Sequence, residues 1–130
     1  MVNGPYFLVE GHDVIAFPSL RDIETFLEPY LEPGELRLFR SDGTELSLTT
    51  NGGPRTPVYK RRVVAGESVI GHDPSHLAEA IRVYLAQPPK RLRRRWGTTT
   101  MPREALRVAE LPQLVEEFVK TYGPEFLRAR

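Results

Sequence analysis

The stretch of sequence that decides the fold is LRLFRSDGTELSL, residues 36–48. Two runs in which apolar and polar residues mostly alternate flank the turn Ser-Asp-Gly-Thr. Asp-Gly in this place is a strong signal for a β-hairpin, because glycine readily adopts the positive φ that the turn needs. We therefore predict an antiparallel hairpin whose buried face carries Leu36, Leu38, Leu46 and Leu48.

Two further strands and a helix are predicted before this hairpin. The runs 6–10 and 14–17 are rich in aromatic and branched residues and are joined by Gly-His-Asp. Ser19 followed by Asp22 is typical of a helix N-cap. Pro29 should end that helix near Glu28, because proline has no backbone N–H to continue it.

After the hairpin, the chain is predicted to form two more strands and then two helices. Glycine and proline residues set their boundaries, at strands 58–65 and 68–70 and helices 73–87 and 112–122. Residues 90–110 fit either a helical turn over 102–107 or an edge strand that contains Leu106 and Val108.

Residues 1–130 are therefore predicted to be a single α+β domain. Strands with one helix among them, followed by helices, favour an antiparallel sheet of four to six strands with about three helices packed mainly on one face. A chain of 130 residues with 40% hydrophobic residues is large enough for one core. The predicted core contains Leu36, Leu38, Leu46, Leu48, Val63, Ile81, Leu85, Leu114, Val115 and Phe118.

The charges are distributed unevenly along the chain. Residues 1–50 hold nine acidic and three basic residues, residues 51–110 hold twelve basic and five acidic ones, and the net charge is only +1. Such a chain is expected to present two electrostatic faces, which influence partner choice and the rate of encounter.

The composition argues against membrane and redox roles. No apolar run approaches the roughly 18–20 residues of a membrane span, and the first residues lack the pattern of a secretory signal. The chain has no cysteine, which excludes disulfides and thiolate chemistry. We expect a cytoplasmic protein without membrane contact.

No enzyme signature stands out. Gly-His-Asp occurs at 11–13 and 71–73, and such His-Asp pairs resemble ligands of metal phosphohydrolases. With His76 the only other histidine, we interpret both triplets as turns whose aspartates accept bonds from nearby backbone amides. The chain has neither a Gly-x-Ser-x-Gly elbow nor a P-loop, so we expect no catalysis, metal or cofactor.

A basic run at residues 90–96, KRLRRRW, is the strongest candidate for a binding site. A second basic run, residues 60–62, would extend the same surface if its strand lies nearby. Three interpretations stay open: a run that is either a solvated loop or a structural element docked on the acidic half, a surface for a protein partner, or a nucleic-acid site with a stacking tryptophan. The candidate partner-binding residues are Lys90, Arg91, Arg93, Arg94, Arg95, Trp96, Lys60, Arg61 and Arg62.

Residues 6–48 suggest a family. The strands of 6–17, the helix of 19–31 with Leu27-Glu28-Pro29 near its end, and the hairpin of 35–48 resemble small bacterial immunity proteins of polymorphic toxin systems. This resemblance implies a non-enzymatic protein that binds a cognate toxin domain and occludes its active site, and it assigns no functional residue.

The charge departs from the pattern of that family. Immunity proteins against basic nucleases tend to be strongly acidic, whereas this chain is near neutral with a basic middle, so a partner with an acidic surface fits better. The alternative function is a small nucleic-acid-binding protein that uses residues 90–96. The pI of this chain is about 8.1, whereas nucleic-acid-binding proteins commonly have a pI above about 9.

Overall fold

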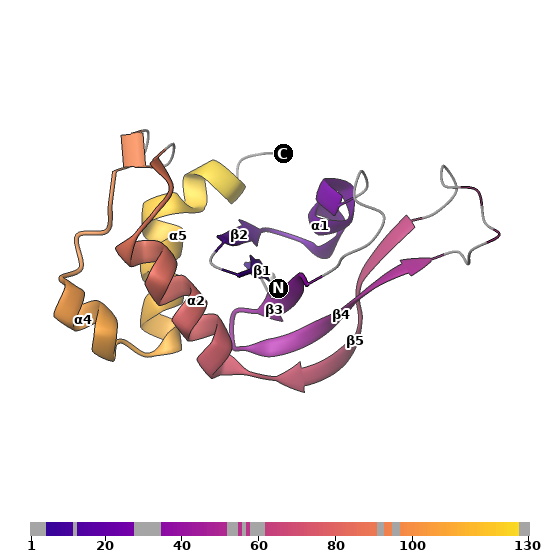
Figure 1. The fold of residues 1–130 in the computed structure, drawn as a ribbon, viewed down its shortest axis with the longest axis horizontal. Helices are drawn as coiled ribbons and strands as arrows, with labels where there is room; N and C mark the ends of the chain where they lie inside the picture. The colour runs from indigo at the N-terminus through magenta and orange to yellow at the C-terminus, as the bar shows by residue number, and fades with distance from the viewer. Residues whose placement is uncertain are drawn as a thin grey trace.

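The computed structural model describes residues 5–11, 13–27, 35–51, 55, 57, 62–90, 93–94 and 97–127, with side-chain surroundings up to residue 122. Five strands form one antiparallel sheet in the spatial order β2-β1-β3-β4-β5 (Figure 1). The strands are β1 (Tyr6–Glu10), β2 (Asp13–Phe17), β3 (Arg37–Arg40), β4 (Thr44–Asn51) and β5 (Arg62–His72). The described helices are α1 (Leu20–Leu27), α2 (Pro74–Ala86), α4 (Arg103–Val108) and α5 (Leu111–Leu127).

The predicted α+β architecture is confirmed, and its central hairpin is the one predicted from Asp-Gly. Strands β3 and β4 pair antiparallel with Leu38 opposite Leu46. Gly43 has a φ of 90°, and its N–H donates to the carbonyl of Arg40 over 3.0 Å to close the turn. The positive φ explains why glycine occupies this position.

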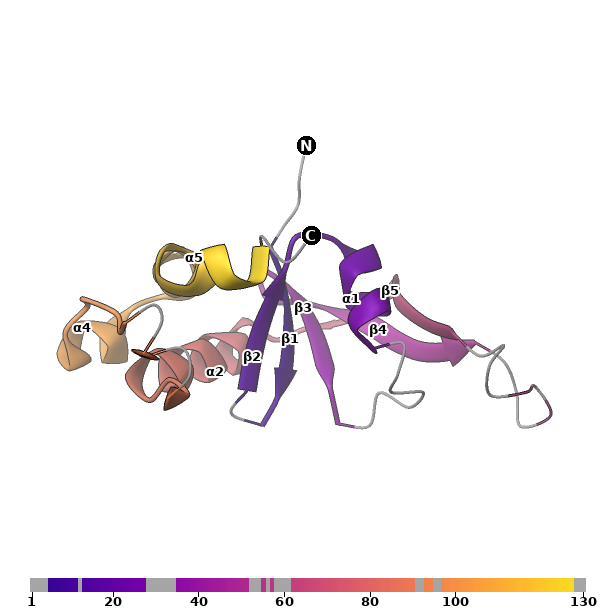
Figure 2. The same cartoon turned by 90° about the horizontal axis from the view of Figure 1, so that it is seen from above.

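The sheet buries both of its faces. On one face, Phe7, Val9 and Phe39 pack against α2 and against Phe118 and Tyr122 of α5. On the opposite face Leu8, Leu38 and Leu46 pack against Ile23 and Leu27 of α1. Figure 2 shows α2, α4 and α5 on one side of the sheet and α1 alone on the other, so most helices share one face as predicted.

The predicted core is largely confirmed. Seven of its residues are buried, namely Leu38, Leu46, Val63, Ile81, Leu85, Leu114 and Phe118. Leu36, Leu48 and Val115 are half-buried against the same clusters. The fully buried Phe39 was missed, because a hairpin with one buried face would expose it.

The helix starts were also predicted correctly. The Ser19 hydroxyl accepts a hydrogen bond from the Asp22 N–H over 3.2 Å, and α1 ends at Leu27. Asp73 caps α2 by accepting from the His76 N–H over 3.2 Å. In the open segment the helical interpretation is the correct one, since Arg103–Val108 forms α4.

Two predicted boundaries were wrong. Gly66 does not separate two strands, because β5 runs unbroken from Arg62 to His72 and absorbs the glycine in a bulge with φ 75°. Helix α5 does not stop at Gly123-Pro124 but continues to Leu127. Proline removes only one backbone donor, and the burial of Phe118 and Tyr122 anchors the preceding turns.

Two glycines stand where the sheet touches a helix. A Cβ on Gly43 would lie 2.5 Å from Pro74 Cα at the start of α2, and one on Gly66 would lie 2.6 Å from Leu20 Cδ1 at the start of α1. No helix of the described residues has the length and apolar character that crossing a bilayer requires.

Gly43→Ala should be far more destabilising than Gly11→Ala. Both glycines have a positive φ, but a Cβ on Gly11 meets nothing within 4 Å. We expect losses in the free energy of unfolding of about 2–4 kcal/mol at Gly43 and about 1 kcal/mol at Gly11, measured by urea denaturation. Equal losses would show that the hairpin turn does not pack closely on α2.

Candidate partner-binding surface

Backbone hydrogen bonds link the described residues of the segment after α2. The Arg93 N–H donates to the Pro89 carbonyl over 3.1 Å, and the Gly97 N–H donates to the Arg93 carbonyl over 2.9 Å. Both bonds join residues four apart, as in an α-helix, and Gly97 has a φ of 80°. A glycine in this conformation is a common helix C-cap, so the local sequence itself ends the turn.

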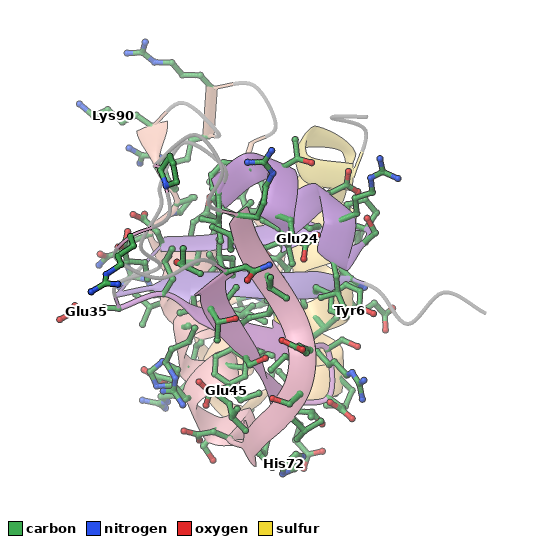
Figure 3. All side chains as sticks on the ribbon, turned by 90° about the vertical axis from the view of Figure 1, so that its right-hand side faces the viewer. Tyr6, Glu24, Glu35, Glu45, His72 and Lys90 are labelled. Atoms are coloured by element: carbon green, nitrogen blue, oxygen red, sulfur yellow. The ribbon has the colours of Figure 1, made fainter. Side chains whose placement is uncertain are left out.

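Three cations of this segment form what we call the basic surface: Lys90, Arg93 and Arg94. Arg93 and Arg94 follow Lys90 by three and four residues, a spacing that brings each of them close to Lys90 on a helix. All three are exposed, and they line a hollow of about 330 Å³. In Figure 3, Lys90 lies at the edge of the molecule, far from His72 at the end of β5.

The basic surface is not neutralised by the acidic half of the chain, as far as the described residues show. None of the ion pairs among them includes Lys90, Arg93 or Arg94. Within that part of the chain, docking of the basic run onto the acidic N-terminal half is therefore not observed.

Two side chains of helix α5 form hydrogen bonds with the chain that follows the basic surface. The hydroxyl of the buried Tyr122 donates to the Gly97 carbonyl over 3.2 Å. Burial raises the pKa of Tyr122, and the nearby positive charge of Arg93 partly opposes this rise. Farther along, the Thr99 hydroxyl donates to the carboxylate of the largely buried Glu117.

The second predicted basic run does not join this surface where the structure describes it. Arg62 is exposed at the start of β5 and lines a separate hollow of about 290 Å³ beside Arg21 and Glu24 of α1. The start of β5 and the segment after α2 lie at opposite ends of the long axis (Figure 1). Five predicted site residues lie outside the described residues: Lys60, Arg61, Arg91, Arg95 and Trp96.

Helix α4 adds arginines that sequence reasoning missed. Arg103 and Arg107 are exposed one turn apart and line a hollow of about 360 Å³ between α2 and α4. Arg82 forms part of this hollow and ties the two helices together, because its guanidinium donates to the Leu106 and Ala109 carbonyls over 2.8 and 3.0 Å. The four-residue spacing of Arg103 and Arg107 in the sequence is the signal that could have predicted two arginines on one face of a helix.

A second polar cluster joins the hairpin to α2. Arg37 donates two hydrogen bonds to Glu45, at 3.0 and 2.7 Å, and one to Asp73 at 3.3 Å. Its guanidinium carbon lies 5.1 Å from the centre of the Phe39 ring, and His76 stacks on the same ring at 5.8 Å. These charged groups bind one another, which indicates that they have a structural role and hold the hairpin against the start of α2.

The charges of this region shift the pKa of several groups. The hydrogen bond and charge of Glu45 raise the pKa of Arg37. The His76 N–H, followed by Arg37, lowers the pKa of Asp73. Backbone and side-chain hydrogen bonds from Thr44 lower the pKa of Asp42 in the hairpin turn.

The two Gly-His-Asp triplets lie in different settings. In the second, His72 ends β5 and Asp73 caps α2. In the first, Gly11 has a φ of 58° and Asp13 begins β2, while His12 lies outside the described residues. The described residues contain no group of three or more histidine or acidic side chains placed to hold a metal ion.

Comparisons with protein-family models, curated proteins and solved structures find no match for this chain.

The shifted aspartates predict a loss of stability in acid. A carboxylate with a lowered pKa in the folded state stabilises the fold above its unfolded value, here about 3.8, and this contribution disappears as the pH falls through the folded pKa. The variant Asp42→Asn/Asp73→Asn should show a shallower decline in the free energy of unfolding below about pH 4, measured by urea denaturation. Asp13→Asn, which changes an exposed aspartate, is the control and should follow the wild type.

Tyr122→Phe should loosen the chain beside the basic surface. Loss of the bond to the Gly97 carbonyl should lower the free energy of unfolding by about 1 kcal/mol and speed amide hydrogen exchange over residues 97–101. Exchange in the β3–β4 hairpin serves as the internal control. Unchanged exchange in both segments would show that this bond does not hold the segment.

Proposed function

We propose that this protein is a non-enzymatic binding module of the immunity type, which docks on a cognate protein through its basic surface. The observation that carries the proposal is the group of three exposed cations, Lys90, Arg93 and Arg94, without ion pairs among the described residues. Their charges are available to a partner, and backbone hydrogen bonds link Arg93 to Pro89 and Gly97.

The hydrogen bonds of the described residues favour tight binding. A residue that is held before docking loses less conformational entropy than one that becomes fixed on contact. Arg93 is bonded to Pro89 and Gly97 through the backbone, and the Gly97 carbonyl also accepts a hydrogen bond from the Tyr122 hydroxyl. Clustered cations also accelerate encounter with an oppositely charged surface. The partner should therefore present an acidic surface, such as one that surrounds an active site.

Two points support the immunity-type interpretation. The first is the resemblance over residues 6–48, the segments that form β1, β2, α1, β3 and most of β4; the basic surface lies outside them, after α2. The second is that occlusion of an active site requires only shape and charge complementarity. The chain can meet this requirement without catalytic groups of its own.

Nucleic-acid binding remains the second candidate, because the same cations also suit phosphates. A binder of extended nucleic acid usually tracks the backbone along a continuous basic groove. Here the described cation of the second basic run, Arg62, lies at the opposite end of the molecule from the basic surface (Figure 1). A localised interface is therefore the better fit.

Reversing two charges should disrupt partner binding. The partner is sought as the product of a neighbouring toxin-type gene and co-purified with the chain, and its affinity is then measured by calorimetry. Arg93→Glu/Arg94→Glu should weaken the affinity by about tenfold to a thousandfold. The matched control is Arg21→Glu/Arg40→Glu, which makes the same change in net charge at two exposed arginines of α1 and β3.

Three outcomes would contradict the proposal. The first is no association with the neighbouring toxin domain at micromolar concentration, and the second is an equal effect of both double variants. The third is salt-dependent binding of single-stranded or duplex DNA in a fluorescence-anisotropy titration, with a log–log slope of about −0.7 or −0.9 per phosphate contact. That result would establish the nucleic-acid alternative if Arg93→Glu/Arg94→Glu abolished it.

A further inference from the structure

The last part of β5 leaves apolar side chains uncovered. Residues 67–70 are all exposed, and Val69 and Ile70 keep 59% and 60% of their surface in solvent. The pairing register explains this exposure. Leu46 lies opposite Val69 and Glu45 opposite Gly71, so Ile70 is the additional residue of a bulge. Because β5 is an edge strand, it pairs with β4 on one side only.

The first part of the same edge is protected. Helix α1 lies over it, and the Glu24 carboxylate accepts the Ala65 N–H over 3.0 Å. The Ser68 N–H donates to the Ser47 hydroxyl of β4 over 3.1 Å, which is a contact on the paired side of β5. No described side chain bonds to the backbone of residues 69–72. Figure 3 shows α1, marked by Glu24, near one end of β5 and His72 at the other, uncovered end.

We propose that this open end of β5, residues 67–72, pairs antiparallel with the same segment of a second copy of the chain. Exposed apolar edges are sites where another strand adds to a sheet. The resulting homodimer would have a sheet that continues across a twofold axis, with the same patch used by both copies. This inference does not depend on the proposed function.

The segment is complementary to itself. With the twofold axis at Val69, the two copies of this side chain face each other, and Ser68 lies opposite Ile70 of the second copy. Glu67 then lies opposite Gly71, beside His72, whereas parallel pairing would bring the two Glu67 carboxylates together. Apolar cross-strand pairs stabilise a sheet, and like charges directly opposite each other destabilise it.

The chemistry of the patch distinguishes it from the basic surface. Residues 67–72 contain one acidic residue and no lysine or arginine, so they offer an apolar contact rather than a charged one. Lys90 and His72 lie at opposite ends of the molecule in Figure 3. Both surfaces are therefore available at the same time, and pairing through β5 leaves the basic surface exposed in each copy.

The test is the oligomeric state of the full chain by sedimentation velocity, from low to high micromolar concentration. The average mass of the wild type should rise from the monomer value of 14.8 kDa towards that of a dimer. Ile70→Lys should weaken the association by about tenfold or more. Val108→Lys is the matched control, because Val108 is 75% exposed on α4, and this variant should dimerise like the wild type.

A second variant and a second measurement guard against misfolding. Val69→Thr/Ile70→Thr keeps branched side chains, so β5 should still form while the apolar contact is lost. In the wild type, amide exchange over residues 69–72 should slow as concentration rises. A wild type that stays monomeric, a dimer that survives both β5 variants, equal disruption by Val108→Lys, or exchange independent of concentration would each overturn the proposal.

Discussion

The packing of the β3–β4 turn against the start of α2 is the contact on which the rest of the structure depends. Gly43 accepts the Asp73 N–H over 2.8 Å through its carbonyl and lies directly against Pro74. Arg37 adds bonds to Glu45 on the hairpin and to Asp73 at the helix cap. This contact fixes the direction in which α2 leaves the sheet. It thereby sets the position of the basic surface, which follows α2 in the chain.

Much of this arrangement could be predicted from local sequence signals. The Asp-Gly turn, the Ser19 and Asp73 caps and the proline stop after α2 each depend on residues close together in the chain, and all are found. The Arg37–Asp73 bond spans 36 residues and leaves no local signature. The burial of Phe39 depends in the same way on helices that follow much later in the chain.

The errors also have physical causes. Gly66 looks like a strand break because glycine favours turns, but its positive φ serves a bulge that lets β5 pass close to Leu20. In the candidate site, the exposure of Lys90, Arg93 and Arg94 agrees with the expectation for a charged run. Their separation from Arg62 could not be predicted, because the distance between two segments depends on the order of strands in the sheet.

The two-sided sheet has a consequence for how such a protein can evolve. Strands β1 and β3 supply side chains to both cores, so changes in these strands affect the whole fold. Among the described residues between α2 and α4, Lys90, Arg93 and Arg94 are exposed and belong to neither core. Natural variation can therefore alter the charge at these positions without changing the framework beneath them, and a lineage can acquire new partner preferences while it keeps the same five strands.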